Sequence, residues 1–229
     1  MRYFIYKEFA KFRLGFYVFA ISAIYCVAWI YFDLSDSIDK FSITSYTLQL
    51  MYNKVFSYNH LDELNLLFAV IIAILSMFYE RQNARIRLQL HFPQSYSKNI
   101  MLLTLVPLCF LLFVYIFEIL ALFLVFTKFF PIEISNALLI TLINNIIFSV
   151  GLYFVAQSMM VEPNNKRAIG ILFIGVICVW IYFKLNPDVG NSSYYYLNEI
   201  VWCYFALWVV FGAMTLLYSL KNYKRGYIK

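Results

Sequence analysis

The sequence predicts an all-α, polytopic membrane protein with six transmembrane helices, and three observations support this fold class. Hydrophobic residues make up 63% of the 229 residues and charged residues 13%, against a usual charged share of about 25%. Six apolar runs reach or approach the roughly 20 residues that a span needs. Lys and Arg gather at alternate ends of these runs. A soluble domain of this length would leave much apolar surface exposed, so we expect lipid around a single membrane domain, residues 1–229.

The predicted spans are residues 16–32, 64–79, 100–126, 134–161, 168–185 and 200–220, and the second is the shortest. Tyr31 and Phe32 stand where a signal-peptide cleavage site would need small residues. We therefore expect the first span to remain as a transmembrane helix. The four cysteines all lie inside predicted spans without a C-x-x-C pair, which is typical of apolar packing residues.

The distribution of basic residues predicts the orientation of the spans. One set of span ends carries fourteen of the eighteen Lys and Arg residues, while the other carries Lys40, Lys54, Lys128 and Lys184. Cytoplasmic loops of membrane proteins are enriched in Lys and Arg. We therefore expect both termini in the cytoplasm and an even number of spans. The net charge of +6 reflects this orientation and does not indicate a nucleic-acid partner.

Residues 1–14 predict an amphipathic helix that lies in the inner membrane interface. An apolar face would be formed by Ile5, Phe9, Phe12 and Phe16, which recur at helical spacing. Lys7 and Lys11 would lie opposite this face, and Arg13 precedes the first span. The alternative is a generic positively charged lead-in to the first span.

The segment between the first two spans, residues 33–63, is polar with aromatic interruptions and contains no Pro or Gly. A short interfacial helix is predicted there by the spacing of Leu48, Met51, Tyr52 and Val55. The rest of the segment is free either to extend the outer ends of the flanking helices or to form a lid.

No pattern in the sequence indicates catalysis or a resident cofactor. None of the seven glycines precedes a lysine, so a P-loop for ATP is absent. His60 and His91 fall on opposite sides of the predicted membrane, which excludes a shared zinc site. No serine-nucleophile signature occurs, and no cluster of carboxylates lies within the spans. We therefore expect no catalytic residue, no metal site and no cofactor in this chain.

Glu118 is a charged residue inside the third predicted span. A carboxylate within the membrane is costly and is expected to face protein or water. One interpretation is a group that lines a transport pathway or contacts a substrate. The alternatives are a structural partner for Asn144, Asn145 or Gln157 in the next span, or a position close to the outer interface.

The basic segment Glu80–Asn99 lies between the second and third spans. Arg81 and Arg85 are four residues apart and share a helix face. Pro93 is expected to end this helix, and Ser95 to cap the third span. The pattern predicts a compact cytoplasmic helix with a charged outer face, which suits contact with a soluble partner. The alternative is a loop that only fixes topology.

This segment resembles the one that follows the second span in ABC-2 type permeases. The resemblance is carried by Tyr79-Glu80-Arg81, Arg85, Arg87-Leu88, Leu90, Pro93 and Ser95. The start, Tyr6-Lys7-Glu8-Phe9 with Phe12-Arg13, is similar to the N-terminal elbow helix of that family, and Leu185-Asn186-Pro187 to its outer Asn-Pro element. Two departures are Ala84-Arg85 in place of the usual glycine-threonine and a polar run after Asn186-Pro187.

The resemblance implies a type V ABC exporter-like fold and a specific function. The chain would be a permease subunit of the bacterial cytoplasmic membrane that exports a substrate. It would be paired with a second permease copy, either identical or related. A separate dimer of ABC ATPase subunits would bind ATP and Mg. The coupling residues would be Glu80, Arg81, Arg85, Arg87, Pro93 and Ser95. The elbow helix would contribute Lys7, Phe9, Lys11, Phe12 and Arg13.

Two other functions are considered from the residues. A non-transporting anchor or assembly subunit of a larger complex would show the same basic docking helix. A membrane enzyme that acts on lipid would need a clustered polar site at one interface, and the sequence shows none.

Overall fold

The computed structural model describes residues 2–53, 55–81, 96–185, 193–194 and 199–226, and in this part of the chain it is helical apart from one two-residue strand pair. The helices are α1 (Arg2–Phe41), α2 (Ile43–Asn53), α3 (Leu61–Arg81), α5 (Tyr96–Phe129), α6 (Ile132–Val161), α7 (Asn165–Leu185) and α8 (Glu199–Gly226). The strands β1 (Val55–Phe56) and β2 (Ser193–Tyr194) pair antiparallel.

Six of the described helices, all except α2, are long and apolar enough to cross a membrane. The prediction of an all-helical chain with six candidate spans is therefore confirmed. Many large apolar side chains on α1, α7 and α8 are exposed, among them Trp29, Phe173 and Leu217. Such exposure suits a surface that faces lipid rather than water.

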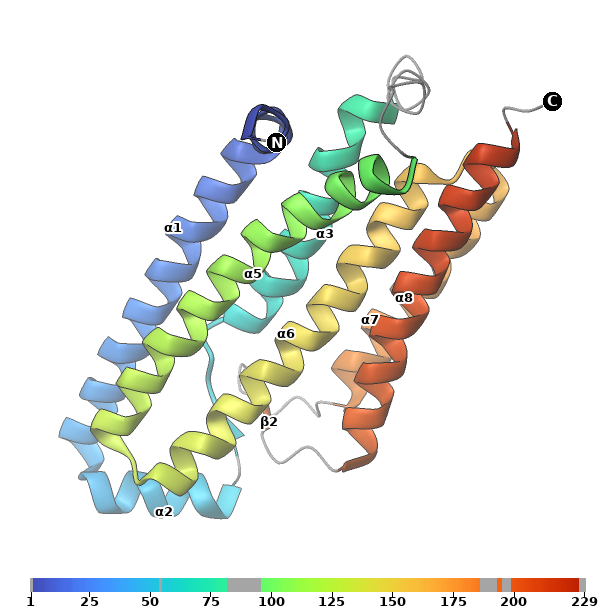
Figure 1. Cartoon of the computed structure of the whole chain (residues 1–229). Coiled ribbons are helices and arrows are strands. Elements are labelled where there is room, and N and C mark those ends of the chain that lie inside the picture. The colour runs from blue at the N-terminus through green and yellow to red at the C-terminus, as the bar shows by residue number, and fades with distance from the viewer. Residues whose placement is uncertain (1, 54, 82–95, 186–192, 195–198, 227–229) are drawn as a thin grey trace.

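The central element is α6, which packs against α3, α5, α7 and α8 (Figure 1). Most residues of its span are buried, whereas few residues of the α7 span are. The other side of the bundle is formed by α1, which packs against α3 and α5. The core therefore follows α6, and α7 is attached to the bundle mainly through α6.

Two glycines allow α6 and α8 to cross closely. A Cβ on Gly212 would lie 2.7 Å from the carbonyl oxygen of Gly151. A Cβ on Gly151 would lie 2.4 Å from the ring of Trp208, and the Trp208 indole donates a hydrogen bond to the Phe148 carbonyl at 3.2 Å. Small residues at helix crossings are the usual way for membrane helices to approach. This crossing fixes α8 on the core.

The first predicted span is shorter than the helix that the structure shows. The helix continues past residue 32 to Phe41, where Ser42 adopts a left-handed conformation (φ 66°) and donates from its backbone N–H to the Ile38 carbonyl at 3.0 Å. This is the hydrogen bond of an αL helix cap. An exposed Lys40–Asp36 pair accompanies the last turns. The predicted short outer helix exists as α2, although Val55 lies beyond it in β1.

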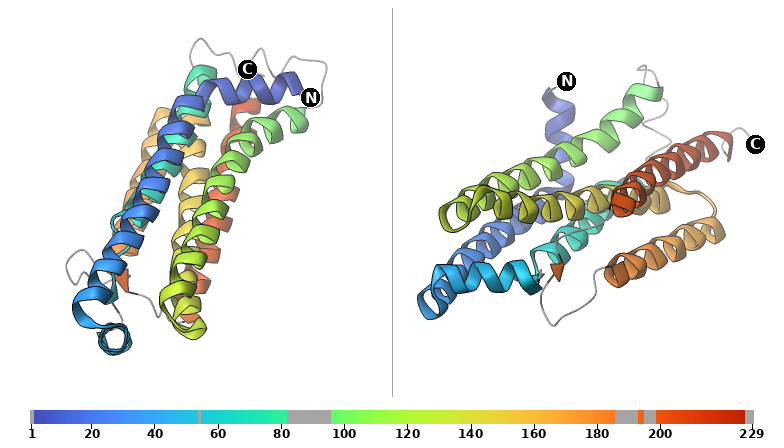
Figure 2. Two further views of the ribbon diagram at one scale, coloured as in Figure 1. Left: turned by 90° about the vertical axis from the view of Figure 1, so that its left-hand side faces the viewer. Right: turned by 90° about the horizontal axis from the view of Figure 1, so that it is seen from below.

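Both termini lie at the same end of the bundle (Figure 1), as an even number of spans requires. At this end the first turns of α1 lie across the bundle, and the helix then bends to run along it (Figure 2). The helix α2 lies across the opposite end (Figure 1). This transverse start is continuous with the rest of α1, which has no break in its helical hydrogen bonding.

Candidate functional site

An ion triad joins the N-terminal part of α1 to the last turn of α3. Lys11 Nζ lies 2.5 Å from Glu8 Oε2 and 2.5 Å from Glu80 Oε1. The exposed fractions of these side chains are only 9% for Lys11, 0% for Glu8 and 3% for Glu80. One cation therefore serves two buried carboxylates, and the interaction is shielded from water. The predicted coupling residue Glu80 belongs to this triad.

Lys11, which was expected opposite the apolar face of the elbow segment, is nearly buried by its two ion pairs. Glu80, which is 69 residues away in sequence, draws the ammonium group inward. Lys7 and Arg13 are exposed. Phe12 is fully buried, and the Phe9 ring stacks on Phe110 of α5 with centroids 4.6 Å apart. The elbow segment is therefore attached to α3 by charge and to α5 by aromatic contact.

Arg81, the residue after Glu80, faces the other way. Its guanidinium donates a hydrogen bond to Asn165 Oδ1, at the start of α7, over 3.4 Å. Both side chains are exposed. The last two residues of α3 thus contact α1 on one side and α7 on the other. The remaining predicted coupling residues, Arg85, Arg87, Pro93 and Ser95, lie outside the described residues.

Glu118 belongs to a buried polar network that we call the Asn65 network. Asn65 of α3 donates to Glu118 Oε2 at 3.0 Å and to Asn145 Oδ1 at 3.2 Å. Asn145 in turn donates to the Tyr182 hydroxyl at 2.8 Å, and the Tyr115 hydroxyl donates to the Asn65 carbonyl. The network therefore connects α3, α5, α6 and α7. Of the interpretations of Glu118, this geometry favours the structural one.

The three predicted partners of Glu118 have different environments. Asn145 is linked to Glu118 through Asn65. Gln157 belongs to a second buried group, in which its amide donates to the Ser76 and Tyr153 hydroxyls. Asn144 is buried, and its side-chain amide has no hydrogen-bond partner in the described part of the chain. The direct partner, Asn65, was not predicted; its signal was a lone amide within the apolar second span.

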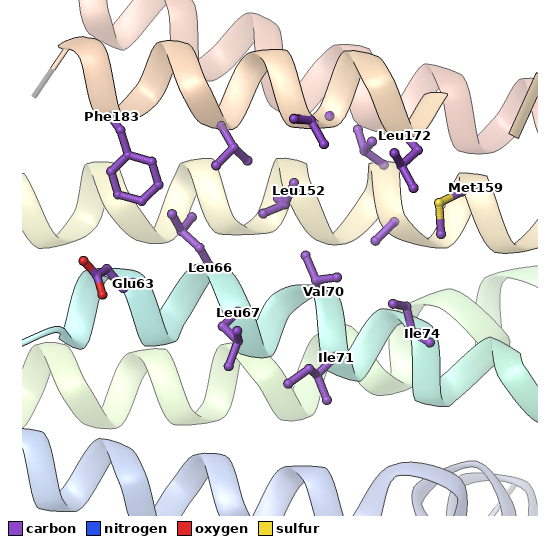
Figure 3. Close-up of a pocket in the computed structure, with 15 residues that line it drawn as sticks. Glu63, Leu66, Leu67, Val70, Ile71, Ile74, Leu152, Met159, Leu172 and Phe183 are labelled. Carbon is purple, nitrogen blue, oxygen red and sulfur yellow. The ribbon is translucent and has the colours of Figure 1, made fainter. Parts of the chain in front are cut away.

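An apolar groove of about 620 Å³ lies between α3 and α7, with α6 as its floor. Figure 3 shows Leu66, Val70 and Ile74 of α3 on one side and Leu172 and Phe183 of α7 on the other. Glu63 lines one end of the groove (Figure 3) and pairs with His60 at 3.1 Å. The weak attachment of α7 to the rest of the bundle leaves this groove open. Its lining suits an apolar ligand or a lipid chain.

Among the described residues, no group of three or more His, Cys, Asp or Glu side chains is placed to hold a metal ion. Comparison with known proteins does not add a family: no protein-family model, no curated protein and no solved structure matches this chain. The candidate site is therefore defined by its geometry: the triad and Arg81 at the end with both termini, the Asn65 network within the bundle, and the apolar groove beside it.

Proposed function

We propose that this chain is the membrane-spanning permease subunit of an ABC-2 type transporter, which exports a substrate across the cytoplasmic membrane. ATP hydrolysis would occur on a separate ATPase subunit, and the permease would act as a pair. Six candidate spans, an N-terminal segment across one end of the bundle and a basic segment after the second span support this proposal.

The observation that carries the proposal is the position of Glu80 and Arg81, which end α3 and begin the basic segment. Glu80 holds Lys11 of α1, and Arg81 contacts Asn165 of α7. A soluble subunit that moves this segment would therefore act on both neighbouring helices at once. Because the triad is buried, its charges are weakly screened by solvent, and the connection to α1 is the stronger of the two.

The apolar groove supports a lipid or a hydrophobic peptide as the exported substrate. Its lining offers few polar groups to bind a sugar or a nucleotide. A ligand in the groove would contact α3, the helix that ends at Glu80. Substrate and ATPase would thus act on the same helix.

The test is a double charge reversal, Arg81→Glu with Arg85→Glu, in the tagged full-length chain. Losing one partner of a desolvated interfacial charge pair costs on the order of 2–5 kcal/mol, so the variant should insert normally but no longer co-purify with a P-loop ATPase in mild detergent. Lys221→Glu with Lys224→Glu, at the end of α8, is the matched control and should retain the ATPase. The remaining basic residues still dominate orientation, so insertion should survive both changes.

The outcomes separate the proposal from its alternatives. If the double reversal binds its ATPase and supports ATP-dependent transport at the wild-type rate, the basic segment only fixes topology. If the wild-type chain co-purifies with a complex that contains no P-loop protein, a non-transporting anchor subunit is the better description.

A further inference from the structure

A second cavity, separate from the groove, lies between α7 and α8, next to the α6–α7 turn, at the end of the bundle with both termini. Its volume is about 560 Å³, and its polar lining includes Glu162, Arg167, Thr215 and Ser219. The apolar part of the lining includes Ile171, Ile174, Phe211 and Met214. None of these residues belongs to the triad, the Asn65 network or the groove.

Glu162 is the unusual member of this cavity. Its exposed fraction is 2%, and neither carboxylate oxygen has a hydrogen-bond partner among the described residues. Buried polar groups are normally hydrogen-bonded, and an unpaired buried carboxylate is costly. Glu162 also caps the C-terminus of α6, with its backbone N–H on the Ser158 carbonyl, and a helix C-terminus disfavours negative charge. Both effects call for a cation at this carboxylate.

Two neighbouring groups extend the polar end of the cavity. The Ser219 side chain is fully buried, and its hydroxyl also lacks a partner within the described part of the chain. Arg167, in the first turn of α7, is exposed. A ligand that carries both a cation and an anion would satisfy Glu162 and Arg167 together, whereas a simple cation would leave the guanidinium without a counter-charge from the ligand.

The apolar lining continues from the polar end toward the middle of the membrane. The lining extends roughly 10–12 Å along each helix, at a rise of 1.5 Å per residue. It runs from Arg167 to Ile174 on α7 and from Ser219 to Phe211 on α8. Glu162 and Arg167 lie at the ends of candidate spans, where headgroups of the bilayer are located. The cavity therefore has the polarity profile of one phospholipid: charged at the interface and apolar below it.

We propose that this cavity binds a phospholipid with a primary amine headgroup, namely phosphatidylethanolamine. Its ammonium group donates a hydrogen bond to the Glu162 carboxylate, which rotates out of its buried position to face the lipid, and its phosphate accepts from Arg167. The upper part of an acyl chain covers the apolar lining. A choline headgroup has no N–H to donate, and a glycerol headgroup brings no cation to Glu162. This site does not depend on the proposed transport function.

The test uses the delipidated full-length chain in detergent, titrated with dioleoyl lipids that differ only in the headgroup. Bound lipid is counted by native mass spectrometry, and the melting temperature is recorded in parallel. Since a hydrogen bond to a charged group is worth about 1.5–3 kcal/mol, phosphatidylethanolamine should bind about tenfold or more tightly than phosphatidylcholine. Glycerophosphoethanolamine, which lacks the chains, should bind at least about tenfold more weakly than the lipid, because the apolar lining stays uncovered.

Variants assign the preference to named residues. Glu162→Gln should remove the preference for ethanolamine over choline, and it should also leave the lipid-free melting temperature equal or higher, because an unpaired buried charge is gone. Arg167→Gln should weaken the binding of both phosphatidylethanolamine and phosphatidylcholine, while the preference for ethanolamine over choline remains. Glu133→Gln, an exposed carboxylate at the other end of α6, is the matched control and should change neither result.

Four results would overturn the proposal. The first is equal binding of phosphatidylethanolamine and phosphatidylcholine by the wild-type chain, and the second is tighter binding of phosphatidylglycerol than of phosphatidylethanolamine. The third is equal binding of glycerophosphoethanolamine and phosphatidylethanolamine. The fourth is a Glu162→Gln variant that still prefers ethanolamine over choline. A lower lipid-free melting temperature for Glu162→Gln would show that the carboxylate already has a stabilising partner, which also contradicts the assignment.

Discussion

Replacement of Lys11 by methionine tests whether the ion triad holds α1 to α3. The substitution keeps a long unbranched side chain but leaves Glu8 and Glu80, with exposed fractions of 0% and 3%, without their shared cation. Removing one partner of a buried ion pair costs about 3–5 kcal/mol, because the other charge stays buried and unpaired. Here two carboxylates lose their partner, so the upper part of this range is expected.

The assay is thermal unfolding of the purified chain in detergent, followed by size-exclusion chromatography of the heated samples. For a chain of this size the loss corresponds to a melting temperature lower by roughly 10 °C or more. Lys40→Met is the matched control, since it removes a lysine from the same helix whose pair with Asp36 is exposed. Exposed pairs of this kind contribute little to stability, so the control should melt close to the wild type.

A rescue variant separates charge from packing. Lys11→Met combined with Glu8→Gln and Glu80→Gln should regain most of the lost stability, because no unpaired charge remains buried. The reasoning is refuted if Lys11→Met melts like the wild type, or if the triple variant melts as low as the single one.

Packing and charge give three other expected outcomes. Gly212→Ala should lower the free energy of unfolding by about 1–3 kcal/mol, because its Cβ would lie 2.7 Å from the Gly151 carbonyl oxygen. Gly170→Ala is the control and should not lower the melting temperature, because a Cβ at Gly170 meets open space. Glu118→Gln should stay close to wild-type stability, because its amide oxygen still accepts the hydrogen bond from Asn65. Glu118→Leu should lower the free energy of unfolding by about 1–3 kcal/mol, and equal losses for the two variants would contradict this reasoning. Reporter fusions at Asn99 and Lys229 should report the cytoplasm and one at Ser192 the outside, and a periplasmic signal at Lys229 would contradict the orientation.

The six candidate spans were predictable because a span depends on local composition. An apolar run of sufficient length specifies a membrane helix regardless of what it packs against. The ends were less predictable, since helical hydrogen bonds do not stop where hydrophobicity does. The first helix continues to Phe41, beyond the predicted end of its span at residue 32, through a polar stretch that contains no Pro or Gly.

The contacts of the candidate site were predicted only in part, because each depends on residues far apart in the sequence. Helical periodicity placed Lys11 opposite the apolar face but did not reveal its partner Glu80, which is 69 residues away. Glu118 was recognised as a buried charge from its position, yet its direct partner Asn65 is 53 residues away. Periodicity describes one helix, whereas the direction of a polar side chain is decided by the neighbour that the fold supplies.

The helix α3 connects every part of the candidate site. It carries Glu80 of the triad, Asn65 of the polar network and one wall of the apolar groove. Fifteen residues separate Asn65 from Glu80, which is roughly 22 Å along a helix. In the proposed transporter, a displacement of the basic segment would therefore reach the groove and the Asn65 network through one rigid element. Since Asn65 contacts both α5 and α6, α3 cannot shift along its axis without breaking buried hydrogen bonds. Such a motion requires the network to exchange partners, so removal of the Asn65 amide should alter transport more than it alters attachment of the ATPase.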